Sequence, residues 1–203
     1  MRKLICSALM ILCLVLTGCG STKEQKFESA RSRLTEAGIS LTAQVQADFG
    51  ETVEEYTLDY SYDGEIWTVL VREPEFVSGI TARIGEDASE LEYDGAILTT
   101  GDLTGSGIVP ISAVPMVWET LETGTVDSVW FEENLLAAML IYDDVISVTL
   151  WINEMYDPVA ATLAEDGIVK ATCTLTNIQI EEANHGTNDE TDLGGDQSGE
   201  SGT

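Results

Sequence analysis

The feature that most constrains this chain is an alternation of apolar and polar residues with a period of two. It is clearest over residues 39–49, where apolar side chains are separated by Ser, Thr, Gln or Asp. The apolar members are Ile39, Leu41, Ala43, Val45, Ala47 and Phe49. Successive side chains of a strand point to opposite faces, so this segment predicts a β-strand that buries one face.

The same pattern recurs on either side of turn sequences. Residues 56–62 and 66–71 flank Asp63-Gly64, a strong hairpin signal, and are expected to pair in antiparallel fashion. Asp94-Gly95, Asp143-Asp144 and Glu165-Asp166-Gly167 are further turn signals. The remaining predicted strands are 76–84, 91–99, 126–132, 135–142, 145–152, 159–164 and 168–178.

Two segments have helical spacing instead. Residues 27–37 predict a short helix, and residues 110–122 carry an apolar stripe that includes Val117 and Trp118. Pro115 is tolerated only in the first turn, which places the start of this helix near Val114. The expected order is therefore one helix, four or five strands, a second helix and five strands, in a mainly β (α+β) fold built on an antiparallel sheet.

The N-terminus has the composition of an export signal. Arg2 and Lys3 precede an almost purely apolar run over residues 4–16. This run is shorter than the roughly 20 apolar residues that span a bilayer. We therefore interpret residues 1–18 as a signal peptide, outside the folded domain.

Leu16-Thr17-Gly18-Cys19 resembles the lipobox of bacterial lipoproteins. The resemblance implies cleavage between Gly18 and Cys19 and a covalent diacylglycerol on Cys19. Two acyl chains, at about 0.8 kcal/mol per buried methylene, anchor a protein stably. The expected location is the extracytoplasmic face of the cell membrane, with residues 19–26 as a tether.

Charge limits the partners of the mature chain. Removal of Arg2 and Lys3 with the signal leaves seven basic residues against 36 acidic ones, a net charge of −29. Such a surface repels nucleic acid and favours solubility. Residues 181–203 are acidic and polar and predict a disordered tail, which leaves residues 27–180 as one domain.

Few residues are suited to catalysis or metal binding. The single histidine, His185, lies in the tail, and Cys173 alternates with the apolar face of its strand. Neither a Ser-His nor a Cys-His catalytic pair can form in the folded part. No disulfide can form there either, because Cys173 is its single cysteine. Clustered zinc ligands and an EF-hand pattern are also absent. The sequence therefore predicts a protein that is not an enzyme and that needs no metal or other cofactor.

The order of these elements resembles the LolA-like lipoprotein-carrier superfamily. The resemblance covers residues 28–180 and rests on Tyr62-Asp63-Gly64-Glu65-Ile66-Trp67, Leu150-Trp151-Ile152 and Asp157-Pro158-Val159. It implies a sheet curled into an incomplete barrel with helices covering its concave face. Members include periplasmic carriers and germination lipoproteins that act through a partner protein. An anchor at Cys19 disfavours a freely diffusing carrier.

Two hypotheses for function follow. In the first, a half-barrel holds an apolar ligand or lipid in a groove; in the second, an accessory lipoprotein docks an envelope protein through its sheet edge. Large apolar side chains that could line such a groove, or fill a sealed core, are Tyr56, Tyr60, Met116, Trp118, Met139 and Leu140. An open cavity favours the first hypothesis, and a sealed core with an exposed edge strand favours the second.

Overall fold

The computed structural model describes residues 22–85, 88–101, 103 and 107–181. The signal peptide, Cys19 and most of the predicted tail lie outside these residues. The elements, in chain order, are α2 (Lys23–Thr35), β1 (Gly38–Asp48), β2 (Val53–Tyr62), β3 (Trp67–Glu73), η1 (Glu75–Val77), β4 (Thr81–Ile84), β5 (Ser89–Tyr93), β6 (Ala96–Thr100), η2 (Pro110–Ser112), α3 (Ala113–Thr123), β7 (Thr125–Glu132), β8 (Leu135–Ile141), β9 (Ile146–Ile152), β10 (Pro158–Glu165) and β11 (Ile168–Glu181).

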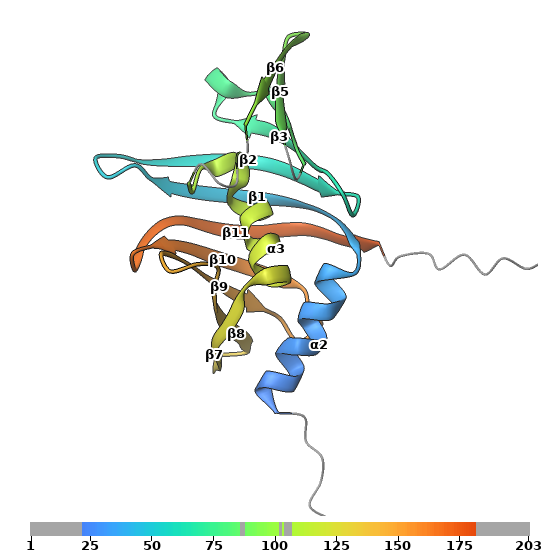
Figure 1. Ribbon diagram of the computed structural model, residues 1–203, viewed down its shortest axis with the longest axis vertical. Coiled ribbons are helices and arrows are strands. Elements are labelled where there is room, and N and C mark those ends of the chain that lie inside the picture. Colours follow the sequence, from blue (N-terminus) through green and yellow to red (C-terminus); the bar gives the residue numbers. More distant parts are fainter. Residues whose placement is uncertain (1–21, 86–87, 102, 104–106, 182–203) are drawn as a thin grey trace, which may run out of the picture.

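All the strands belong to one antiparallel sheet of eleven strands. Their order is β6-β5-β4-β3-β2-β1-β11-β10-β9-β8-β7, so β1 pairs with β11 at the centre of the sheet. β6 and β7 lie at opposite ends and do not pair, which leaves the sheet open (Figure 1). The predicted fold class, an unclosed antiparallel sheet with covering helices, is confirmed.

Six strands precede α3, instead of the four or five expected. Residues 91–99 form two strands because Asp94 and Gly95, at φ +50° and +77°, turn the chain back on itself. The predicted strand 76–84 is wrong in its first half, where the short helix η1 replaces it. Gly79 at φ +89° bends the chain there, so only Thr81–Ile84 joins the sheet.

α2 begins at Lys23, earlier than the sequence analysis placed it. Thr22 accepts a hydrogen bond from the Gln25 backbone N–H, and the Gln25 side chain accepts one from the Thr22 N–H. This capping box satisfies two N–H groups that a helix end otherwise leaves unpaired. Residues 23–26, which we expected to belong to the tether, are therefore helical.

α3 is the element that fills the interior. All residues from Ala113 to Trp118 are buried, and Thr120 and Leu121 are buried as well. Pro115 lies in the first turn, as expected. α3 crosses the sheet, and α2 packs beside it against β7 and β8 (Figure 1). We call the face of the sheet under these helices the helix-covered face, and the opposite one the outer face.

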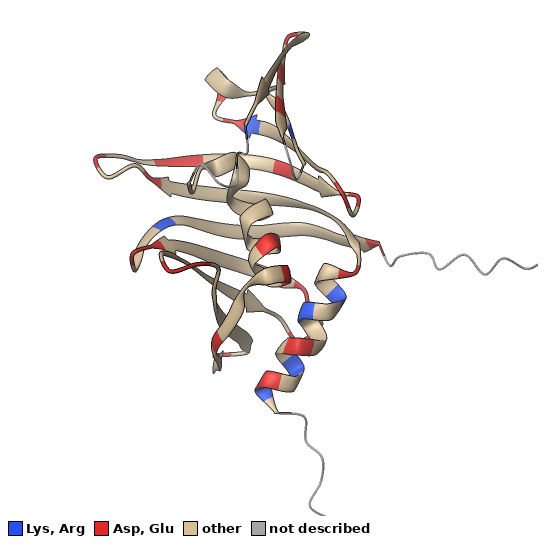
Figure 2. Ribbon diagram, in the orientation of Figure 1, with Lys and Arg blue, Asp and Glu red and all other residues tan. Residues whose placement is uncertain are grey.

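Most charged positions lie at the periphery of the sheet and on the helices. Figure 2 shows acidic residues concentrated at turns and strand ends and on the helices, while most of the strand surface carries no charge. Four of the chain's basic residues lie on α2: Lys23, Lys26, Arg31 and Arg33. The strands carry acidic residues too, among them Asp59 of β2, Glu90 and Glu92 of β5 and Asp127 of β7.

Candidate functional site

The residues proposed to line a groove are mostly sealed inside the protein. Tyr60, Met116, Trp118 and Leu140 are each at most 2% exposed and belong to one continuous core. The structure thus brings these four together, but as core packing. A side chain without accessible surface presents nothing to a ligand.

Aromatic rings pack against one another in this core. Trp67 stacks on Tyr62 at 4.8 Å between ring centroids and meets Trp118 edge-on at 5.6 Å. The buried indole N–H of Trp118 donates to the Leu34 carbonyl at 3.2 Å, and the Tyr60 hydroxyl donates to the Pro110 carbonyl at 2.7 Å. Burial raises the pKa of Tyr60 well above its ordinary value, so the hydroxyl stays a neutral donor.

The other two candidates lie elsewhere. Met139 pairs with Ser128 and Thr149 on the outer face, because adjacent residues of a strand point in opposite directions and Leu140 points inward. Tyr56 lines a small apolar recess of about 180 Å³ beside η1 and η2. Its other lining residues are Val71, Val77, Ile80, Val109, Pro110 and Ile111. Ligand sites usually occupy about 300–1,000 Å³, so this recess is too small for an acyl chain.

Cys173 is buried and unpaired, as its alternation with the apolar face suggested. Burial raises the pKa of its thiol to about 12. The thiol is therefore protonated at neutral pH and unreactive, since only the thiolate is a good nucleophile.

The β6 edge is the most exposed apolar element of the sheet. Ile97 is 64% exposed and Leu98 is 62% exposed, on opposite faces of the same strand. The two-residue turn makes Tyr93 and Ala96 a hydrogen-bonded pair. In an antiparallel ladder such pairs alternate with non-hydrogen-bonded pairs, to which Ile97 and Thr99 belong. The backbone N–H and C=O groups of Ile97 and Thr99 therefore point away from β5, to the free side of the strand.

The opposite edge strand, β7, is covered. The Lys23 ammonium on α2 donates to the Val129 carbonyl, and the Arg31 guanidinium donates to the Gly124 carbonyl at 2.9 Å. β7 also carries the charges of Asp127 and Glu132. Proteins commonly protect edges with charge or with covering elements, and β6 has neither charge nor proline.

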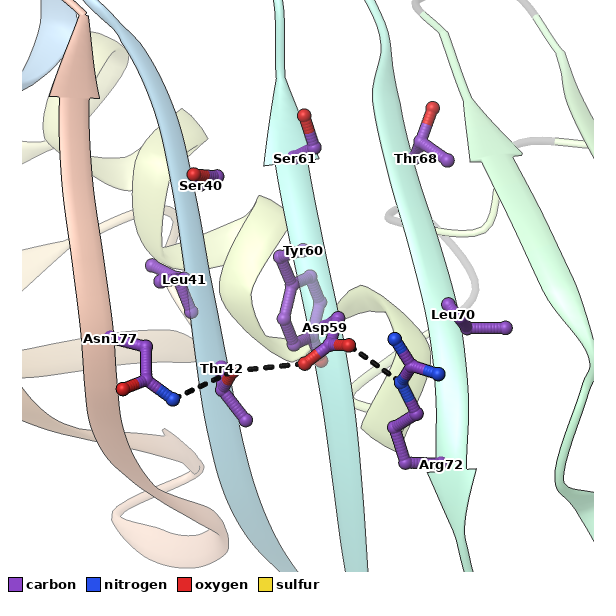
Figure 3. Close-up of a pocket in the computed structure, with 10 residues that line it drawn as sticks. All are labelled: Ser40, Leu41, Thr42, Asp59, Tyr60, Ser61, Thr68, Leu70, Arg72 and Asn177. Atoms are coloured by element: carbon purple, nitrogen blue, oxygen red, sulfur yellow. Dashed lines mark hydrogen bonds and ion pairs between the residues drawn. The ribbon is translucent and has the colours of Figure 1, made fainter.

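A polar hollow lies on the outer face where β11, β1, β2 and β3 meet. Its volume is about 350 Å³, and Figure 3 shows a chain of polar contacts across it. Asn177 donates to the Thr42 hydroxyl, which donates to Asp59 at 2.9 Å, and Arg72 pairs with the second oxygen of Asp59 at 2.6 Å. The hollow therefore offers hydroxyl, amide, carboxylate and guanidinium groups for hydrogen bonding.

The described residues contain neither a cluster of metal ligands nor a membrane-spanning helix. Within the described residues no cluster of three or more His, Cys, Asp or Glu side chains is arranged to hold a metal ion. Neither α2 nor α3, the two α-helices of the described part, has the length and apolarity of a membrane span.

Comparison with known proteins finds similarity to solved structures only. No protein-family model and no curated protein matches the chain. Among solved structures, an uncharacterized conserved protein from Thermus thermophilus has a TM-score of 0.49 at 12% identity, covering 80% of this chain and 90% of that one. A LolA superfamily protein from Nitrosomonas europaea has a TM-score of 0.46 at 10% identity, covering 75% and 92%.

A third similar structure comes from the complex of the CwlD amidase with the GerS lipoprotein of Clostridioides difficile. It has a TM-score of 0.42 at 12% identity and covers 80% of this chain and 98% of that one. The solved structures similar to this chain therefore include a LolA superfamily protein and a complex that contains a lipoprotein. No residue's role carries over at these identities.

Proposed function

We propose that this chain is a lipid-anchored, non-catalytic accessory lipoprotein of the extracytoplasmic membrane face, which binds an extended segment of an envelope protein along β6. The observation that carries the proposal is the contrast between a sealed core and an unprotected edge strand. Exposed edge strands commonly recruit an added strand from a partner.

The start of α2 and the β6 edge lie at opposite ends of the domain (Figure 1). Only two residues separate Cys19 from Thr22, the N-cap of α2, and an extended chain spans at most about 3.6 Å per residue. A lipid on Cys19 thus holds the start of α2, and β7 beside it, close to the membrane. β6 is at the other end of the strand order and lies far from the start of α2 (Figure 1), so in this proposal it faces away from the membrane.

The surroundings of β6 specify the chemistry of the partner. Glu90 and Glu92 lie opposite Thr99 and Ile97 on the neighbouring strand, and Asp94 lies in the turn. An added strand would gain backbone hydrogen bonds from the edge and apolar contacts with Ile97. Basic side chains on that strand would complement the carboxylates. We therefore expect a segment in which apolar and basic residues alternate.

A photo-crosslinking experiment tests this docking mode in cells of the native host. A benzoylphenylalanine at position 97 should give one discrete adduct with another envelope protein, and the same group at the exposed Val169 of β11 should not. Thr99→Pro removes an outward N–H without breaking the β5–β6 ladder. We expect it to weaken the adduct about tenfold, the effect of losing about 1.4 kcal/mol.

Two results would contradict the proposal. The first is an adduct at position 97 that survives Thr99→Pro unchanged or that appears equally at position 169. The second is an adduct of twice the mass of the chain, which would identify the occupant of the edge as a second copy of this protein.

A further inference from the structure

The outer face carries a continuous strip of uncharged residues that spans seven strands. One row runs from β7 to β2 through directly paired residues, and the adjacent row runs from β7 to β1. We call these two rows the neutral band. The first row is Trp130, Ala137, Trp151, Ala160, Thr174, Gln44 and Thr57. The second row is Ser128, Met139, Thr149, Thr162, Thr172 and Gln46.

The absence of charge from this band is unexpected for the chain. Acidic residues outnumber basic ones by 27 overall, yet none of the residues in the band is charged. A solvent-facing sheet surface normally carries part of a protein's charge. Carboxylates border the band, where Glu132, Glu55 and Glu73 accept hydrogen bonds from Trp151, Gln46 and Thr57. The band itself offers hydroxyl, amide and indole groups, which match a ligand that is itself uncharged and able to hydrogen-bond.

Half of the chain's tryptophans lie in this band. Trp130 and Trp151 flank Ala137 on the neighbouring strands, so their Cα atoms are about 10 Å apart across two strand spacings. Ala137 is fully buried although both α-helices lie on the other face. We infer that the two indoles on the neighbouring strands shield it, which places both rings on the outer surface.

Each indole is positioned to contact a ligand. The Trp151 N–H donates to the Glu132 carboxylate at 2.8 Å, which fixes the orientation of that ring. The Trp130 N–H makes no hydrogen bond to another residue of the described part. Both rings are partly exposed, so their faces are accessible.

These features together identify a ligand class. We propose that the neutral band binds an uncharged β-1,4-linked glycan strand, with pyranose rings stacked on Trp130 and Trp151 and hydroxyls bonded to the Thr and Gln side chains. A flat β-linked glycan presents apolar C–H faces to aromatic rings and hydroxyls along its sides. The band is about 29 Å long by strand spacing, so it accommodates a chain of several sugars.

The polar hollow continues this surface. Gln44 and Thr57 of the band lie two residues from Thr42 and Asp59 on the same strands, and these two side chains border the hollow (Figure 3). A glycan that crosses the band thus reaches hydroxyl, amide and guanidinium groups at its far end. This site uses neither β6 nor the helix-covered face, so it is independent of the proposed edge docking.

Calorimetric titration of the full-length protein, purified in detergent, tests the proposal. The probe is the β-1,4-linked hexamer of N-acetylglucosamine, and maltohexaose, which is α-linked and curved, is the comparator. We expect the β-linked hexamer to bind and maltohexaose to bind at least about tenfold more weakly. Trp130→Ala and Trp151→Ala should each weaken binding of the β-linked hexamer about tenfold, the effect of losing about 1.4 kcal/mol.

Matched variants separate binding from folding. Phe131→Ala removes an exposed ring next to Trp130 but on the other face, and it should leave affinity unchanged. Trp151→Phe keeps an aromatic face and should retain most of the affinity. Thr174→Glu places a charge at an exposed position of the band and should weaken binding without loss of fold.

The proposal is overturned if the β-linked hexamer does not bind, or if it binds no better than maltohexaose. It is equally overturned if Thr174→Glu and the two Trp→Ala variants bind like the unmodified protein, or if Phe131→Ala weakens binding as much as they do.

Discussion

Replacing Cys19 with alanine is expected to abolish lipid attachment completely. The thioether can form only at a thiol, and Cys19 is the cysteine that follows the apolar run of the signal after Thr17 and Gly18. Cells grown with an alkyne analogue of palmitate should label the unmodified protein and leave Cys19→Ala unlabelled. The variant should also keep its signal and migrate as the longer precursor, since cleavage follows lipidation.

Cys13→Ala provides the matched control, because Cys13 lies within the apolar run and is removed with the signal. This variant should be labelled and processed like the unmodified protein. Labelling of Cys19→Ala, or loss of labelling in Cys13→Ala, would contradict the assignment of Cys19 as the lipidated residue.

Trp118→Ala is expected to have the largest effect on stability. Trp118 is the largest fully buried side chain and contacts Trp67. Its indole N–H also donates to the Leu34 carbonyl, which ties α3 to α2. Truncation of a buried tryptophan costs about 3–5 kcal/mol, which is a large part of the roughly 5–15 kcal/mol that stabilises a typical domain. Urea unfolding followed by circular dichroism should show the midpoint lowered with an unchanged slope.

Phe76→Ala is the control for this measurement. Phe76 is 75% exposed on η1, so its loss should change the free energy of unfolding by less than about 0.5 kcal/mol. A loss below about 1 kcal/mol for Trp118→Ala would mean that Trp118 does not pack as described, because surface truncations have effects of that size.

The sequence predicted the sheet well because period-two alternation and turn chemistry are local signals. The five strands after α3 lie within two or three residues of their expected bounds, and the Asp63-Gly64 and Asp94-Gly95 turns are where the residues placed them. Thr22 and Gln25 carried a capping-box signal that would have placed the start of α2 correctly. The chain reversal at Gly79 was missed because a single glycine is a weak signal.

The candidate sites were harder to predict because they depend on which face of the sheet the helices cover. Alternation shows that Met139 and Leu140 point to opposite faces, yet it cannot say which of the two faces is covered. Trp130 and Trp151 lie on the outer face, whereas Trp67 and Trp118 lie in the core under the helices, and the sequence pattern does not distinguish the two cases. Likewise, no local pattern identifies Ala96–Thr100 as an edge, since edges are defined by strand order.

Our central claim is that the core is sealed and that binding takes place on outer surfaces. Native mass spectrometry of the chain from Ser21 to Glu182, before and after organic extraction, tests it most directly. We predict the bare mass of the polypeptide in both samples, because Tyr60, Met116, Trp118 and Leu140 are sealed in the core and the apolar recess beside Tyr56 has only about 180 Å³. A co-purified acyl species that extraction removes would contradict the claim and would show that the helix-covered face opens to hold a lipid.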